Sequence, residues 1–215
     1  MRLHYVRRGG GDPVVLLHGR PGFWYDWRHV IVPLAEEADV VALDFRGFGG
    51  SGKPEGDPKY LYTQDHLASD VLALLDHLGI RRFVVAGHDT GAVIAQVLAR
   101  RAPERVSALV LFNPPRSAIG DKPQEPASQR EAWYGHFHVL PWSHELVAYN
   151  RDTVGLYLRH PYDRWMGNRD SVRPKRFELS WTPSPDRTRS EQASAATGPI
   201  RRRNPSGWKH SARLP

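Results

Sequence analysis

The stretch AGHDTGA, residues 86–92, places an aspartate where the pattern predicts a sharp turn. Residues 83–86 are an apolar run typical of a buried strand, and apolar side chains recur at helical spacing after the turn. Gly87 and Gly91 stand two positions on either side of Asp89, which allows a strand and a helix to crowd around a strained residue. We therefore expect the carboxylate of Asp89 to be presented at the tip of this turn as a nucleophile.

The alternative explanation of Asp89 is a structural one, in which the residue only caps the N-terminus of the helix, because aspartate is a favoured N-cap residue. A capping residue does not need glycines on both sides, whereas a crowded turn does. The glycine spacing therefore favours the nucleophile over the cap. At the N-terminus of a helix the carboxylate would also be kept ionised by backbone N–H groups and the helix dipole.

Short apolar segments and helical patterns alternate around this turn. Strands are predicted at residues 3–8, 14–17, 40–43, 83–86 and 107–112. Helices are predicted at about residues 26–37 and 63–78, the second with Gly79 at its C-terminal cap. The later strands are unbroken apolar runs, such as a parallel sheet buries on both faces. The pattern therefore predicts an α/β fold with a doubly wound, mostly parallel sheet.

The residue composition changes twice after the alternating strands and helices. We assign residues 1–117 to the core and residues 118–177 to a helical cap, because residues 125–173 are rich in Trp, Tyr and His at helix-like spacing. Residues 178–215 mix Pro, Ser, Arg and Gly with almost no apolar periodicity, which predicts a disordered or non-native tail. Such a tail is typical of a shifted reading frame or a truncation, in which case the last strands would be missing and an apolar sheet edge would be exposed.

The net charge of +7 is concentrated in the same tail. Residues 174–215 carry nine Lys and Arg against three Asp and Glu, so the earlier part has the charge balance of an ordinary soluble enzyme. A nucleic-acid role for Arg201 to Arg203 is disfavoured, because a short charge run is usually just solvated. Without cysteine, disulfides, thiol catalysis and Cys-ligated zinc are excluded. We found no long apolar segment and no signal-peptide core, and expect a cytoplasmic protein that does not enter a membrane.

Three motifs together resemble one family. They are LLHGRPGFWYDWRHVIVPLAEEADVVALDFRGFGGSGKP (16–54), AGHDTGA (86–92) and EAWYGHFH (131–138). In this order and spacing they resemble the α/β-hydrolases with an aspartate nucleophile, most closely the epoxide hydrolases. The resemblance covers about residues 1–177, and the first two motifs are the more specific. It implies an enzyme without cofactor or metal that opens an epoxide through an aspartyl ester and hydrolyses the ester to a diol.

The resemblance also assigns roles around Asp89. HGRP, residues 18–21, is similar to the family's oxyanion loop, so the backbone N–H groups of Arg20 and Thr90 would stabilise the charge that develops during ester hydrolysis. His18 would be a structural hydrogen-bonding residue of that loop, next to Gly19 and Pro21. Ser51 is expected to be only a turn residue.

Epoxide opening needs a proton donor for the departing oxygen, and Tyr134 is the candidate. It lies 45 residues after Asp89, where the similar epoxide hydrolases place the first of two ring-opening tyrosines. A core tyrosine with a local hydrogen-bond partner is the alternative, and Tyr149 and Tyr157 are competitors for the role.

Two other functions remain open. Haloalkane and fluoroacetate dehalogenases use the same aspartate ester, but they place a halide-binding tryptophan or carboxylate-binding arginines after the nucleophile, where Thr90 and Val93 stand here. These departures favour a small neutral organic substrate.

The family's catalytic acid, its histidine and the second tyrosine have no matching stretch, and neither Asp186 nor His210 has the right context. A non-catalytic remnant is therefore the third possibility, and the oligomeric state is left undetermined.

Overall fold

The computed structural model describes residues 1–114, 130, 132–165, 167 and 209–213. The chain divides into two compact units, residues 1–115 with 201–215 and residues 116–200, and each is described by itself.

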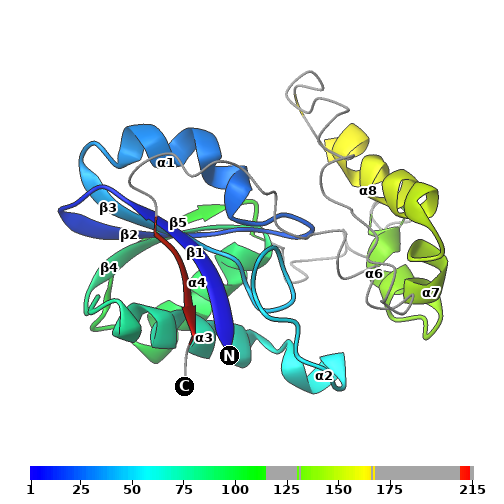
Figure 1. The fold of residues 1–215 in the computed structure, drawn as a ribbon, viewed down its shortest axis with the longest axis horizontal. Helices are drawn as coiled ribbons and strands as arrows, with labels where there is room; N and C mark the ends of the chain where they lie inside the picture. The colour runs from blue at the N-terminus through cyan, green and yellow to red at the C-terminus, as the bar shows by residue number, and fades with distance from the viewer. Residues whose placement is uncertain (115–129, 131, 166, 168–208, 214–215) are drawn as a thin grey trace. The chain divides into compact units, whose positions relative to one another are not determined.

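The first unit is built on a six-stranded sheet with the strand order β5-β4-β2-β3-β1-β6 (Figure 1). Neighbours among β5, β4, β2 and β3 are parallel, whereas β1 is antiparallel to β3 and β6 is antiparallel to β1. The strands are β1 (Arg2–Arg8), β2 (Asp12–Leu17), β3 (Ala38–Leu43), β4 (Phe83–His88), β5 (Val106–Phe112) and β6 (Lys209–Arg213). The predicted α/β sheet is confirmed, and its four parallel strands end at the same edge.

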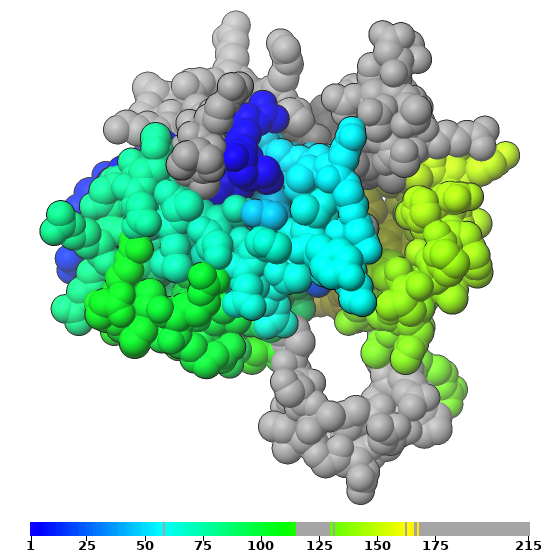
Figure 2. Space-filling model, turned by 90° about the horizontal axis from the view of Figure 1, so that it is seen from below, coloured from blue at the N-terminus to red at the C-terminus, as the bar shows by residue number. Residues whose placement is uncertain are grey.

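Helices cover both faces of this sheet. One face carries η1 (Trp24–Trp27) and α1 (Arg28–Leu34), and the other carries α3 (Gln64–His77) and α4 (Thr90–Arg101), which lie side by side (Figures 1 and 2). A short α2 (Pro58–Leu61) precedes α3. Because strand side chains alternate between faces, Leu16 packs with Trp27 and Ile31, while Val15 and Leu17 belong to the cluster formed with α3 and α4. Burial on both faces explains the unbroken apolar runs of the sequence.

Helix α3 has the ends that the sequence predicted. The hydroxyl of Thr63 accepts a hydrogen bond from the backbone N–H of His66 and caps the first turn. Gly79 follows the C-cap with φ +72°, a conformation that costs glycine nothing. Among the described helices, none is both long and apolar enough to cross a bilayer.

The structure differs from the sequence prediction at two elements. The helix expected at 26–37 is a 3-10 turn followed by α1, which ends at Leu34 with Pro33 in its last turn. Most of the expected tail, residues 178–215, lies outside the described residues. Within it, however, Lys209–Arg213 form β6 beside β1, so this segment is not the unstructured chain that its composition predicted.

The second unit contains the helices α6 (Trp133–His138), α7 (Ser143–Val147) and α8 (Arg151–Trp165). Aromatic rings join α6 to α8, with Trp133 and Phe137 of α6 both packed against Tyr157 of α8. The helical character expected for this region agrees with the described part of it.

Candidate active site

Asp89 occupies a sharp turn between β4 and α4. Its φ of 51° and ψ of −117° are unusual for a residue with a side chain, and the turn is held by backbone hydrogen bonds. The N–H of Asp89 donates to the carbonyl of Phe112 at 3.0 Å, and its carbonyl accepts from the N–H groups of Ala92 and Val93 at 3.0 and 3.3 Å. The strand to one side and the first turn of the helix to the other therefore fix the residue in this conformation.

Three glycines permit the close packing of this turn. A Cβ atom added at Gly87 would lie 2.3 Å from the carbonyl oxygen of Gly91, and one added at Gly91 would lie 2.2 Å from that of Leu17. A Cβ atom at Gly19 would lie 2.7 Å from the Cβ of Asp89. Side chains at these positions would push β2, β4 and α4 apart, which is the physical reason for the glycine spacing.

The two carboxylate oxygens of Asp89 have different surroundings. Oδ2 accepts a hydrogen bond from the backbone N–H of Arg20 at 3.0 Å and one from the hydroxyl of Thr90 at 3.2 Å. Among the described residues no hydrogen bond reaches Oδ1. Arg20 lies here because β2 and β4 pair in register, Leu17 beside Gly87, so that the loop after β2 runs past the turn after β4. One oxygen is thus held by donors and the other is left available for reaction.

The Arg20 side chain reaches the same place as its backbone. Its Nε donates to the hydroxyl oxygen of Thr90 at 3.3 Å, and Arg20 itself is exposed to solvent. Sequence reasoning assigned only the backbone groups of Arg20 and Thr90, and these side-chain contacts were missed. The signal available was that both positions carry side chains able to form hydrogen bonds, Arg20 in HGRP and Thr90 directly after Asp89.

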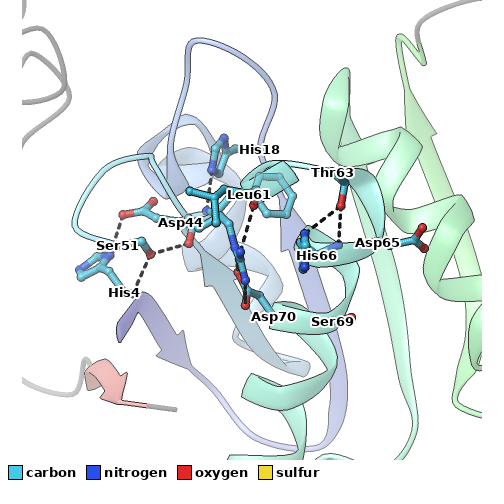
Figure 3. A network of polar contacts seen from close by, with 12 residues as sticks. His4, His18, Asp44, Ser51, Leu61, Thr63, Asp65, His66, Ser69 and Asp70 are labelled. Atoms are coloured by element: carbon cyan, nitrogen blue, oxygen red, sulfur yellow. Dashed lines mark hydrogen bonds and ion pairs between the residues drawn. The ribbon is translucent and has the colours of Figure 1, made fainter. Parts of the chain in front are cut away.

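His18, the residue before Gly19, links the loop after β2 to the loop after β3 (Figure 3). Its Nε2 accepts from the backbone N–H of Phe45 at 3.1 Å, while Nδ1 lies 2.8 Å from the carbonyl oxygen of Gly19. An accepting Nε2 requires the neutral ring with its proton on Nδ1. Complete burial lowers the pKa of His18 and outweighs the raising effect of the Asp44 carboxylate, so the neutral form is favoured.

Asp44 forms a second link between these loops. Its fully buried carboxylate accepts from the backbone N–H of Trp24 at 2.7 Å and from that of Gly50 at 2.9 Å, and it lies 2.8 Å from Nδ1 of His4. The buried hydroxyl of Ser51 donates to the Asp44 carbonyl and accepts from the His4 N–H (Figure 3). The loop containing HGRP is therefore clamped at both ends, at His18 and at Trp24. Ser51 lies in a turn as expected, but its hydroxyl also cross-links that turn to β1.

Tyr134 lies in α6 of the second unit. Its side chain is partly exposed and its ring packs edge to face against Trp165 at 5.2 Å. The competitor Tyr157 is half-buried, its hydroxyl contacts Nε2 of His138, and burial raises its pKa. The expected approach of Tyr134 to Asp89 stays a prediction, because the two residues belong to different units.

Within the described residues no three or more His, Cys, Asp and Glu side chains are arranged to hold a metal ion. The contacts described above define a site with a carboxylate on a tight turn, faced by the backbone N–H of Arg20 from a neighbouring loop.

A family model described as alpha/beta hydrolase fold matches residues 12–153, which contain both the turn and the HGRP loop. The chain belongs to the α/β-hydrolase fold family. Relatives of this α/β-hydrolase include human epoxide hydrolase 4, which is 36% identical over 151 residues that make up 68% of this chain and 41% of the relative. A soluble epoxide hydrolase of Corynebacterium sp. (strain C12) is 37% identical over 161 residues, 74% of this chain and 54% of the relative.

Solved structures agree with these relationships. The epoxide hydrolase VrEH1 of Vigna radiata superposes with a TM-score of 0.58 at 32% identity, covering 73% of this chain and 50% of that one. A putative alpha/beta hydrolase from Nostoc sp PCC 7120 superposes with a TM-score of 0.74 at 26% identity, covering 91% of this chain and 65% of that one. The α/β-hydrolase described here spans about half the length of the two relatives compared by sequence.

Proposed function

We propose that this α/β-hydrolase is a cytoplasmic enzyme that opens the epoxide of a small neutral organic substrate through a covalent ester on Asp89. The observation that supports it best is the unequal treatment of the Asp89 oxygens, with Oδ2 held by the Arg20 N–H and the Thr90 hydroxyl and Oδ1 left without a donor among the described residues. Relatives named as epoxide hydrolases support the same chemistry.

In the first step Oδ1 of Asp89 attacks one epoxide carbon. The bond between that carbon and the epoxide oxygen breaks, and the oxygen keeps the two bonding electrons. The hydroxyl of Tyr134 donates a proton to this oxygen. The products are an alkyl ester on Asp89 and a neighbouring alcohol. Because a carboxylate attacks a saturated carbon readily, aspartate suits this step as serine suits acyl transfer.

In the second step water attacks the ester carbon of Asp89. Negative charge then develops on Oδ2, where the backbone N–H groups of Arg20 and Thr90 would stabilise it. Collapse of the tetrahedral intermediate breaks the bond between Cγ of Asp89 and Oδ1. Oδ1 leaves with the substrate carbon, takes up the proton that the attacking water has lost and becomes the second hydroxyl of the diol, while the water oxygen stays in the regenerated carboxylate. Within the described residues no histidine donates a hydrogen bond to Asp89, so we expect this step to be slow.

A dehalogenase would use the same aspartate, and the residues after it argue against that alternative. A halide leaves without a proton but needs donors to receive it, and the positions discussed above hold Thr90 and Val93.

The experiment is to incubate the protein with excess styrene oxide and follow it by intact mass spectrometry and a diol assay. We expect one covalent adduct per chain and little turnover, with no adduct for Asp89→Ala or Asp89→Asn. A folded protein that forms no adduct would contradict the proposal, and an adduct with 1-bromobutane but not with the epoxide would favour the dehalogenase. Steady diol production that Asp89→Ala abolishes would show that the chain does contain a base.

A further inference from the structure

The Thr90 hydroxyl and the Arg20 side chain form a short hydrogen-bond chain to the nucleophile. Arg20 Nε lies 3.3 Å from Thr90 Oγ1, and Oγ1 lies 3.2 Å from Asp89 Oδ2. A hydroxyl has one proton to give. Since the guanidinium Nε can only donate, Thr90 must accept from Arg20 and give its own proton to Asp89.

We propose that the Thr90 hydroxyl is a third, side-chain oxyanion donor to Oδ2 of Asp89 and that the Arg20 guanidinium is the positioning residue that fixes and polarises it. This inference rests on the proposed ester chemistry and names residue functions that the oxyanion loop's backbone alone would not supply. Thr90 is a catalytic residue in this scheme because it contacts a reacting carboxylate oxygen.

The geometry supports a role beyond local packing. The Arg20 backbone N–H and the Thr90 hydroxyl converge on the same oxygen, at 3.0 and 3.2 Å. The threonine contact is longer than an ideal O–H···O hydrogen bond, and such contacts shorten when charge develops on the acceptor. The Arg20 guanidinium, which donates to the Thr90 hydroxyl, strengthens the hydrogen bond from that hydroxyl to Asp89, because hydrogen bonds in a chain polarise one another.

The two half-reactions should respond to this chain in opposite directions. Ester formation removes the negative charge of Asp89, so a donor on Oδ2 stabilises the reactant carboxylate more than the neutral ester and opposes this step. Ester hydrolysis returns negative charge to Oδ2, so the same donor accelerates that step. A residue that only supports the fold would not separate the two rates in this way.

The experiment measures both rates by intact mass in a single turnover with styrene oxide. We expect Thr90→Val, which keeps the shape of the side chain and removes the hydroxyl, to form the adduct roughly threefold faster. The same variant should lose the adduct at least about tenfold more slowly. Thr90→Ser, which restores the hydroxyl, should return both rates toward those of the parent protein. Equal changes in both rates, or none, would overturn the proposal.

The Arg20 part is tested in the same assay with Arg20→Met, which retains the backbone N–H. It should shift both rates in the same directions as Thr90→Val but by less, since the guanidinium acts through the hydroxyl. The double variant should behave as Thr90→Val alone. Effects that multiply in the double variant would show that Arg20 acts independently of Thr90 and would overturn the chain.

An infrared measurement separates failure of this inference from failure of the proposed function. Donors on only one oxygen widen the separation between the two carboxylate stretching bands, and Asp89→Asn identifies the bands of Asp89. Thr90→Val should narrow that separation in the absence of any substrate. An unchanged separation between the two bands would overturn the inference even if the adduct forms. A smaller separation would support the hydrogen bond from Thr90 even if no adduct forms.

Discussion

His18 is a buried side chain that helps to position the backbone N–H of Arg20, which donates to Asp89, without contacting it. Its Nε2 must accept from Phe45, which only the neutral ring can do. The link holds the start of the loop whose next residues include the Arg20 donor. A buried histidine that has to stay neutral makes the stability of the unit depend on pH.

We predict a loss of stability at low pH that is carried by His18. Burial lowers its pKa in the folded protein below the ordinary value of 6.5, with Asp44 and Asp89 opposing and His88 reinforcing that shift. The unfolded chain therefore binds the proton first, so the contribution is fully present above about pH 6.5 and is lost as the pH falls toward the folded value. Per pH unit in that window the loss approaches about 1.4 kcal/mol.

The measurement is urea unfolding between pH 5 and 7.5 for the parent protein and His18→Gln. The Gln amide reaches about as far as Nε2 of His18, so its oxygen can accept from the Phe45 N–H, but it does not titrate. The difference between the two free energies of unfolding should therefore shrink as the pH falls. A difference independent of pH would contradict the prediction. Because the protein has 11 histidines, only this difference isolates the contribution of His18.

The sharp turn at Asp89 could be predicted from the sequence, whereas the donors to its carboxylate could be predicted only in part. Asp89 is marked by local glycine spacing, which reflects contacts within a few residues. The Arg20 to Thr90 hydrogen bond joins residues 70 apart and depends on side-chain rotamers. The same holds for Asp44, whose partners come from three segments of the chain. No local pattern encodes such contacts.

Among the elements, the junction of β2, β4 and α4 is the most tightly packed part of the candidate site. We predict that Gly91→Ala lowers the free energy of unfolding by about 1–3 kcal/mol, because the added methyl would lie 2.2 Å from the Leu17 carbonyl oxygen and the backbone would have to move. Gly10→Ala is the matched control, since a Cβ atom at Gly10 meets nothing within 4 Å. Urea denaturation should show a change within about 0.5 kcal/mol for the control, and equal effects at both sites would contradict the packing account.

The sequence predicted the elements with strong local patterns and missed the one without such a pattern. Strands β2 to β5 contain runs of apolar residues, β1 alternates apolar with polar residues over Leu3 to Tyr5, and α3 has a cap at each end. The segment Lys209–Arg213 has neither an apolar run nor alternation, and it becomes a strand through its backbone pairing with β1. Pairing of that kind depends on the edge already built by distant residues, so composition alone predicted the wrong structure there.

At the scale of the whole molecule, β5 is an unusual edge of the sheet. Its residues Leu109, Val110, Leu111 and Phe112 are 39, 42, 38 and 48% exposed in the structure, and β4 is the strand that pairs with it among the described residues. An apolar edge strand is a template for association with another chain. The sequence-based expectation of an exposed apolar edge agrees with this finding.

We predict that the protein self-associates as its concentration rises and that Val110→Lys reduces this association. A charged side chain on an edge strand opposes strand pairing between molecules. Val32→Lys is the matched control, because Val32 in α1 is 41% exposed but does not lie on the sheet edge. Sedimentation velocity over a concentration series provides the measurement. Equal suppression by both variants would point to net charge rather than to the edge.

The turn at Asp89 has one more consequence. Its conformation is fixed by the Phe112 carbonyl, by the N–H groups of Ala92 and Val93, and by glycines that keep the neighbouring backbone close. All of these contacts are made by main-chain atoms, so the scaffold does not distinguish which side chain it presents at residue 89. A single substitution at this position would therefore exchange the side chain that the turn presents without rebuilding the turn. The architecture is in this sense open to evolutionary change of reaction at a small structural cost.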